Sequence, residues 1–205
     1  MSEEVFHNII YKVNGAFWQD HICGTGSLLE HTVNVREHLP IIIETFEVTS
    51  MLDAPCGDFS WMSQVMFPSG FKYIGGDIVS KLINEISETY PNFQFIHCDV
   101  VNNELPEVDM LFCRDLLIHL PSTDIIKLIK NAANSNIKYF TASTYHNDHN
   151  NDIDVGQCRS VNLQAAPFNL PEPLYMFDDG CRDVVRSMGV WSQEQLIEAI
   201  ENWAS

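Results

Sequence analysis

The sequence contains no apolar run that approaches the roughly 20 residues of a membrane-spanning helix. Its first residues, Met-Ser-Glu-Glu, carry acid where a secretory signal peptide carries lysine or arginine. We therefore expect a protein that is not inserted in a membrane and not secreted, with a cytoplasmic location.

Basic residues are scarce. The chain has 11 lysines and arginines against 28 aspartates and glutamates, which gives a formal net charge of −17. Nucleic acids and anionic membrane surfaces gain affinity from basic patches, so we expect neither as a partner. With 45% hydrophobic and 11% aromatic residues in 205, the chain is not disordered as a whole and has the length of one domain with appended elements.

No CxxC spacing and no zinc signature occurs among the cysteines. Three of them, Cys56, Cys98 and Cys113, lie in or beside apolar runs that resemble strands, while Cys23, Cys158 and Cys181 are scattered. We interpret them as reduced, buried thiols.

The N-terminal part, residues 1–47, is predicted to be a helical cover. Residues 3–20 and 27–47 favour helices, separated by Gly24-Thr25-Gly26. Ser27 is the expected N-cap, with Glu30 as its capping-box partner. Because proline lacks the amide hydrogen that a helix interior needs, Pro40 is expected to end one helix and open the next.

From residue 48 to 205, strands alternate with helices, as in a parallel α/β sheet. The strands are expected at Ser50–Ala54, Lys72–Gly76, Phe93–Cys98, Asp109–Cys113 and Tyr139–Ser143, with two closing strands at Leu174–Phe177 and Met188–Trp191. The helices are expected at Phe59–Met66 (preceded by Asp58 as N-cap), Val79–Tyr90, Thr123–Asn134 and from the Ser192 cap to Trp203. Residues of about 144–173 are rich in Asn, Asp and Pro and predict a long loop of the kind that binds ligands or forms a lid.

Acidic residues recur where successive strands are predicted to end: Asp53, Asp77 and Asp99. In an open α/β sheet these ends line the crevice that binds ligands. An acid after the second strand is placed to accept both hydroxyls of a ribose. An acid after the third strand is placed to accept from an adenine amino group, with the Val100 amide beside it. The turn after the first strand contains Gly57 but no GxGxxG run, so a cationic ligand near Asp53 fits better than a dinucleotide.

Four segments resemble the class I S-adenosylmethionine-dependent methyltransferases. They are the turn Asp53-Ala54-Pro55-Cys56-Gly57-Asp58-Phe59-Ser60-Trp61-Met62, the run Tyr73-Ile74-Gly75-Gly76-Asp77-Ile78-Val79, the run Cys113-Arg114-Asp115-Leu116-Leu117-Ile118-His119-Leu120, and the stretch from Asn162-Leu163 to Pro167-Phe168-Asn169-Leu170-Pro171-Glu172-Pro173. The resemblance is to the subgroup with a DxPCGDxxWM turn and extends from about Gly24 to Trp191. Members of this subgroup often accompany or are fused to glycosyltransferases of surface-glycan pathways in bacteria and large algal viruses.

The resemblance implies a Rossmann-like α/β fold with a mostly parallel seven-stranded sheet flanked by helices and an N-terminal helical extension. It implies S-adenosyl-L-methionine as cofactor, S-adenosyl-L-homocysteine as product and a sugar hydroxyl of a glycan or glycoconjugate as methyl acceptor. Glycosyltransferases of the same pathway are the implied protein partners, and the host cytoplasm is the implied location for a viral member. The implied cofactor-binding residues are Asp53, Pro55, Gly57, Asp77, Ile78, Asp99, Val100 and Arg114.

Asp115 and His119 are the candidate catalytic residues, because they directly follow the fourth strand. A sugar hydroxyl benefits from a general base as its proton leaves. If Arg114–Leu120 opens as a helical turn, the i and i+4 positions lie on one side. His119 is then the base with Asp115 orienting it, or Asp115 acts alone, or His119 packs under the cofactor.

The predicted acceptor side follows the fifth strand. The candidate substrate-binding residues are Tyr145, His146, Arg159 and Asn162. The spacing of His146, His149, Asp152 and Asp154 is compatible with a divalent ion, but such loops are more often solvated turns, and we assign no metal ligand. Pro167-Phe168 departs from the Asn/Asp-Pro-Pro-aromatic signature of amino-group methylation on nucleobases, which disfavours an adenine methylase.

Three other functions remain open from the residues alone. A methyltransferase acting on a small metabolite differs only in its acceptor. A nucleotide-binding module without catalysis has the same fold. An NAD(P) oxidoreductase lacks the phosphate-cradling glycines here.

Overall fold

The computed structural model describes residues 2–14, 23–180 and 185–203. The predicted helix over 3–20 therefore extends into residues outside the described part, and so does Cys181. Of the described cysteines, Cys56, Cys98 and Cys113 are buried and free, as the sequence suggested, whereas Cys158 is exposed. No helix of the described residues combines the length and the apolar character needed to cross a membrane.

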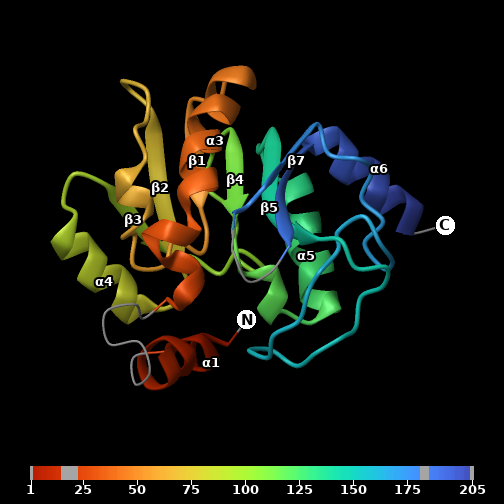
Figure 1. Ribbon diagram of the computed structural model, residues 1–205, viewed down its shortest axis with the longest axis horizontal. Helices are drawn as coiled ribbons and strands as arrows, with labels where there is room; N and C mark the ends of the chain where they lie inside the picture. The colour runs from red at the N-terminus through yellow and green to blue at the C-terminus, as the bar shows by residue number, and fades with distance from the viewer. Residues whose placement is uncertain (1, 15–22, 181–184, 204–205) are drawn as a thin grey trace.

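Seven strands form one sheet in the order β3-β2-β1-β4-β5-β7-β6 (Figure 1). The strands are β1 Ser50–Asp53, β2 Lys72–Asp77, β3 Gln94–His97, β4 Met110–Cys113, β5 Tyr139–Tyr145, β6 Tyr175–Asp178 and β7 Arg186–Ser192. The first five are parallel, and β7 pairs antiparallel with both β5 and β6. The predicted parallel sheet with two closing strands is thus confirmed.

Helices and short helical turns connect the strands. They are α1 Glu3–His7, η1 Asn8–Asn14, η2 Thr25–Ser27, η3 Leu29–His31, α3 Val33–Thr45, η4 Met62–Gln64, α4 Ser80–Thr89, η5 Leu117–His119, α5 Ser122–Ala133 and α6 Gln193–Trp203. In Figure 1, α4 and α6 lie at opposite sides of the molecule, and α1 lies beyond one end of the strands. The Ser192 hydroxyl accepts a hydrogen bond from the Gln195 amide (3.3 Å), so the predicted cap of the last helix is confirmed.

The two faces of the sheet carry separate apolar cores. Successive residues of a strand point to opposite faces, so Met51 of β1 packs with α3 while Leu52 packs with α4 and α5. In β4 the same alternation places Phe112 with α3 and Cys113 with α5. The sheet is the middle layer, and its central strands β1, β4 and β5 are buried on both faces, as the near-continuous apolar runs of a parallel sheet require.

The N-terminal helices differ from the prediction. Ser27 is not the cap of a long helix, because it ends the three-residue turn η2 and α3 begins only at Val33. Pro40 lies inside α3 and does not divide it. Burial of Leu39, Ile42 and Ile43 on this helix offsets the one backbone hydrogen bond that proline removes.

The predicted helix Phe59–Met66 is also wrong. The chain forms only the turn η4 there, because Phe59 has a left-handed backbone (φ +60°) that interrupts a helix. Asp58 caps no helix; its Oδ1 accepts the Ser60 amide (3.0 Å) in a local turn. The Phe59 ring is fully buried among other aromatic rings, and this burial decides the local backbone.

Candidate functional site

The turn after β1 approaches the N-terminal segment closely at Gly57. Gly57 has φ +56°, and a Cβ there would lie 3.0 Å from the Cys23 sulfur. The same sulfur accepts the Asp58 amide at 3.2 Å. Both constraints favour glycine at this position, because an L side chain would be strained and crowded.

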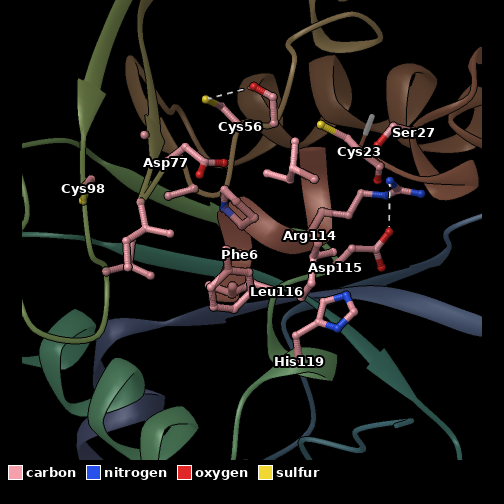
Figure 2. Close-up of a pocket in the computed structure, with 18 of the residues that line it drawn as sticks. Phe6, Cys23, Ser27, Cys56, Asp77, Cys98, Arg114, Asp115, Leu116 and His119 are labelled. Carbon is pink, nitrogen blue, oxygen red and sulfur yellow. Dashed lines mark hydrogen bonds and ion pairs between the residues drawn. The ribbon is translucent and has the colours of Figure 1, made fainter. Parts of the chain in front are cut away.

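One pocket opens at the carboxyl ends of the parallel strands (Figure 2). Its empty space is about 890 Å³, a figure that includes open solvent at its mouth. Most of the lining comes from segments at the ends of β1 to β4. These segments supply Ala54, Pro55, Cys56, Gly57, Trp61, Gly76, Asp77, Ile78, Cys98, Val100, Arg114, Asp115, Leu116 and His119. The N-terminal segment supplies Phe6, Ile9, Ile10, Cys23 and Ser27.

Asp77 ends β2 and is a buried carboxylate of this pocket. Its Oδ1 accepts the Val79 amide at 2.9 Å. Burial raises the pKa of Asp77 to about 6, against the opposing effect of the Val79, Gly57 and Ile78 amides. Above that pH the group is an ionised acceptor with few competing waters, which suits recognition of neutral hydroxyl donors.

Asp53 ends β1 but does not line the pocket, although Ala54 and Pro55 do. Its Oδ2 accepts the hydroxyl hydrogen of Tyr73 at 2.7 Å, on the α3 side of the sheet. Burial raises the pKa of Asp53 to about 7, opposed by the Tyr73 hydrogen bond. The structure therefore places this acid behind the pocket wall.

The third predicted acid, Asp99, also lies outside the lining, two residues past the end of β3. Its Oδ1 accepts the Val101 amide (3.0 Å), and its Oδ2 accepts from the Asn102 side chain (2.9 Å). The neighbours Cys98 and Val100 do line the pocket. Asp99 thus shapes the turn that presents them.

A closed ring of two arginines and two aspartates borders the site. Arg114 donates from Nε to Asp179 Oδ1 (2.9 Å), and its Nη1 lies 3.3 Å from Asp115 Oδ2. Arg186 pairs with the other oxygens of both carboxylates. Arg114 also donates to the carbonyl of Gly26 (3.0 Å), which ties the N-terminal segment to the ring.

Asp115 is held by this ring in an unusual backbone conformation. Its φ is +62°, and its amide donates to the Ser143 hydroxyl at 3.1 Å. The expected helical turn from Arg114 to Leu120 is therefore absent, since η5 spans only Leu117–His119. Asp115 and His119 nonetheless line the same pocket (Figure 2).

His119 has one ring nitrogen engaged. Its Nδ1 lies 2.9 Å from the carbonyl oxygen of Gln157. A carbonyl oxygen can only accept a hydrogen bond, so Nδ1 is the donor in this pair. A neutral imidazole with Nδ1–H in this bond carries its lone pair on Nε2. The Gly156 amide donates to the His119 carbonyl (2.9 Å), so the loop after β5 fixes both the ring and its backbone.

The four predicted substrate-binding residues do not line the pocket. His146 Nε2 contacts the Ser187 hydroxyl (3.0 Å), Arg159 donates to the Leu117 carbonyl (2.9 Å), and Asn162 donates to the Asn147 carbonyl (2.8 Å). Tyr145 is buried. Its side chain interacts with Arg186, so it lies beside the charged ring. Arg159 and Asn162 thus hold the loop of residues 146–174 in place. Across the described residues, no three His, Cys, Asp or Glu side chains come close enough to hold a metal ion.

Residues that the sequence analysis missed complete the site. Phe6, Ile9 and Ile10 have helical spacing, but that pattern identifies an apolar face without saying what it covers. Asp179 and Arg186 lie far from Arg114 along the chain, and no local pattern marks them as its partners.

The sheet order and the pocket at the strand ends define a Rossmann-like α/β fold of the class I methyltransferase type. Comparison with protein-family models gave no match, and neither did comparison with curated protein sequences.

Solved structures with this fold include several methyltransferases. Magnesium protoporphyrin IX methyltransferase from Synechocystis PCC 6803 with bound SAM has a TM-score of 0.64 and 13% identity, covering 93% of this chain and 96% of that chain. The mitomycin 7-O-methyltransferase MmcR has a TM-score of 0.65 and 12% identity, with coverage of 92% and 60%. The N-methyltransferase NodS from Bradyrhizobium japonicum WM9 has a TM-score of 0.57 and 10% identity, with coverage of 78% and 96%. At such identities the likeness establishes the fold.

Proposed function

We propose that this protein is an S-adenosylmethionine-dependent methyltransferase that methylates a hydroxyl group of a carbohydrate. The observation that carries the proposal is the buried Asp77 carboxylate in a pocket that also contains His119. A ligand with a ribose at one end and a reactive group at the other would reach from the end of β2 to the segment after β4.

The residues present fit this cofactor. Asp77 accepts a hydrogen bond from the Val79 amide and lines the pocket as a buried carboxylate, which can accept hydrogen bonds from ribose hydroxyls. Ile78, Cys98 and Val100 give an apolar slot for an adenine ring. The proposal is further supported by the fold, which the methyltransferases described above share, one of them with SAM bound.

Within this pocket, His119 is the proton acceptor. When bound, the cofactor supplies an electrophilic methyl group on a sulfonium. His119 Nε2 takes the proton of the acceptor hydroxyl as its oxygen bonds to the methyl carbon, and the carbon–sulfur bond breaks with its electron pair staying on sulfur. The Gln157 carbonyl holds the imidazole in the tautomer that this requires.

Asp115 has a different part in this proposal. Both of its oxygens are paired with arginines, so it is a poor candidate for removing a proton. Each carboxylate oxygen can still accept a second hydrogen bond. We assign Asp115 to orienting the acceptor hydroxyl towards His119.

The carbohydrate class of the acceptor is supported by the sequence resemblance to glycan methyltransferases that contains Asp53–Met62 and Cys113–Leu120. A glycosyltransferase of the same pathway as partner and a cytoplasmic location belong to the same proposal.

Calorimetric titration with S-adenosylhomocysteine, with NADH as control, tests the cofactor. Saturable binding of the first alone is expected. Transfer of a labelled methyl group to a panel of glycosides, with nucleic acid and small phenols as comparison acceptors, then tests the substrate. If folded protein binds no S-adenosylhomocysteine, the methyltransferase proposal is overturned. Binding with transfer only to a non-carbohydrate acceptor would overturn the glycan part alone.

A further inference from the structure

The first helix lies beyond the ends of the strands and lines the pocket there. Phe6, Ile9 and Ile10 of α1 and η1 line the pocket together with Val100 and Leu116. Phe6 is only 8% exposed, because it belongs to the same apolar cluster as these residues. We call residues 3–11 the α1 cap (Figure 1). A ligand in the pocket would have this apolar face over it.

A charged contact joins the start of the α1 cap to α4. Glu3 Oε1 accepts the amide hydrogen of Ser80, the first residue of α4, at 2.8 Å, and Oε2 lies 3.9 Å from His97 Nε2. The hydrogen bond from the Ser80 amide is the main cause that lowers the pKa of Glu3. A carboxylate at a helix N-terminus also interacts favourably with the helix dipole.

A second contact joins the other end of the cap to the same helix. The Tyr11 hydroxyl donates to the Glu85 carboxylate. Lys81 lies over the Tyr11 ring, with Nζ 3.9 Å from the centroid. The cap is thus fastened to α4 at two points that flank Phe6, Ile9 and Ile10.

The cap also touches the loop that holds His119. At Gly156, an added Cβ would lie 2.4 Å from the Val5 side chain. The Gly156 amide donates to the His119 carbonyl at 2.9 Å. The cap therefore reaches from α4 across the pocket to the segment that positions the proposed base.

We propose that the α1 cap retains the cofactor, and that Glu3 and Tyr11 are positioning residues that hold it closed. This rests on the proposed function, because the retained ligand is S-adenosylmethionine or its product. Neither residue lines the pocket; each acts through the apolar side chains between them. In this proposal the cofactor exchanges when the cap moves away from the pocket, so weakening either contact accelerates release.

Stopped-flow displacement of S-adenosylhomocysteine measures this directly. Glu3→Gln and Tyr11→Phe are each expected to raise the dissociation rate constant about 2- to 5-fold, the range for one exposed charge or hydrogen bond at a helix terminus. The double variant should show a larger increase. Glu4→Gln is the matched control, because Glu4 lies on the same helix and is exposed. The melting temperature should be unchanged in all four proteins, which separates a cap effect from a general loss of stability.

The outcomes distinguish the two proposals. Wild-type protein that binds no S-adenosylhomocysteine would overturn both. Normal binding with wild-type release from the double variant would overturn the cap alone. Equal acceleration by Glu4→Gln and Glu3→Gln would also overturn it, because the effect would then follow helix charge and not the contact with Ser80. Slower amide hydrogen exchange over residues 3–11 when ligand is bound is the expected independent sign of a closed cap.

Discussion

Arg114 and Asp179 form a bidentate ion pair in the interior, with Nε–Oδ1 and Nη2–Oδ2 distances of 2.9 and 3.2 Å. Asp179 is 0% exposed and also pairs with Arg186. One carboxylate therefore compensates two buried guanidinium groups at the border of the pocket. This arrangement joins the end of β4 to the β6–β7 segment and, through the Gly26 carbonyl, to the N-terminal segment.

Loss of the Asp179 charge should destabilise the protein strongly. Asp179→Asn leaves two buried cations with only Asp115 to balance them, and we expect a decrease in the free energy of unfolding of about 3–5 kcal/mol. Urea denaturation measures it. Asp178→Asn is the control, because Asp178 is exposed and its bond to the Gly180 amide needs only an oxygen. Equal stability of the two variants would contradict the role of the ring.

Asp77→Asn should weaken the binding of S-adenosylhomocysteine by about 1–3 kcal/mol, since a charge-assisted acceptor is lost. Because the pKa of Asp77 is raised to about 6, wild-type affinity should also fall as the pH drops through that value and the carboxylate takes up a proton. Calorimetry between pH 5 and 8 measures both effects. The variant should lose this pH dependence, and Asp58→Asn, in the turn after β1 but outside the pocket lining, should retain it. Unchanged affinity of Asp77→Asn would remove Asp77 from the binding site.

His119→Ala should lower kcat by about 10²- to 10⁴-fold, the usual contribution of a general base. Cofactor affinity should change little, because the imidazole is assigned to the acceptor. Methyl transfer at saturating cofactor and calorimetry with S-adenosylhomocysteine separate the two. His149→Ala is the control, since His149 is exposed and lies outside the pocket lining. A full rate in the His119 variant would show that another group accepts the proton.

The pKa of Asp53, raised to about 7 by burial, links folding to pH. Between its unfolded value near 4 and about 7, the folded state binds more protons than the unfolded state, so stability falls as the pH rises through this window. Asp53→Asn is neutral throughout and can still accept the Tyr73 hydrogen. We expect the difference in urea midpoint between pH 5.5 and pH 8 to be smaller in this variant than in wild-type protein. A steeper pH dependence in the variant would contradict this assignment.

Local sequence determined most of the sheet. Runs such as Met51–Leu52 and Met110–Cys113 are apolar at every position, which predicts strands buried on both faces, and the structure confirms them. The acids at strand ends, Asp53 and Asp77, also fall where the pattern predicts, because parallel strands present their carboxyl ends at one edge. The signals involved are short-range: periodicity, turn residues and caps.

Tertiary packing decided the local backbone at Phe59, the directions of the strand-end acids and the partners of Arg114. The backbone at Phe59 is not helical because the Phe59 ring is buried by aromatic residues from β2 and β3 and the neighbouring turns. Asp53 and Asp77 look equivalent in the sequence, yet only Asp77 faces the pocket, since Asp53 points towards Tyr73 on the other side. The partners of Arg114 and the apolar cover over the site come from segments distant along the chain. Their selection depends on which surfaces the packed sheet brings together, and no local pattern encodes that.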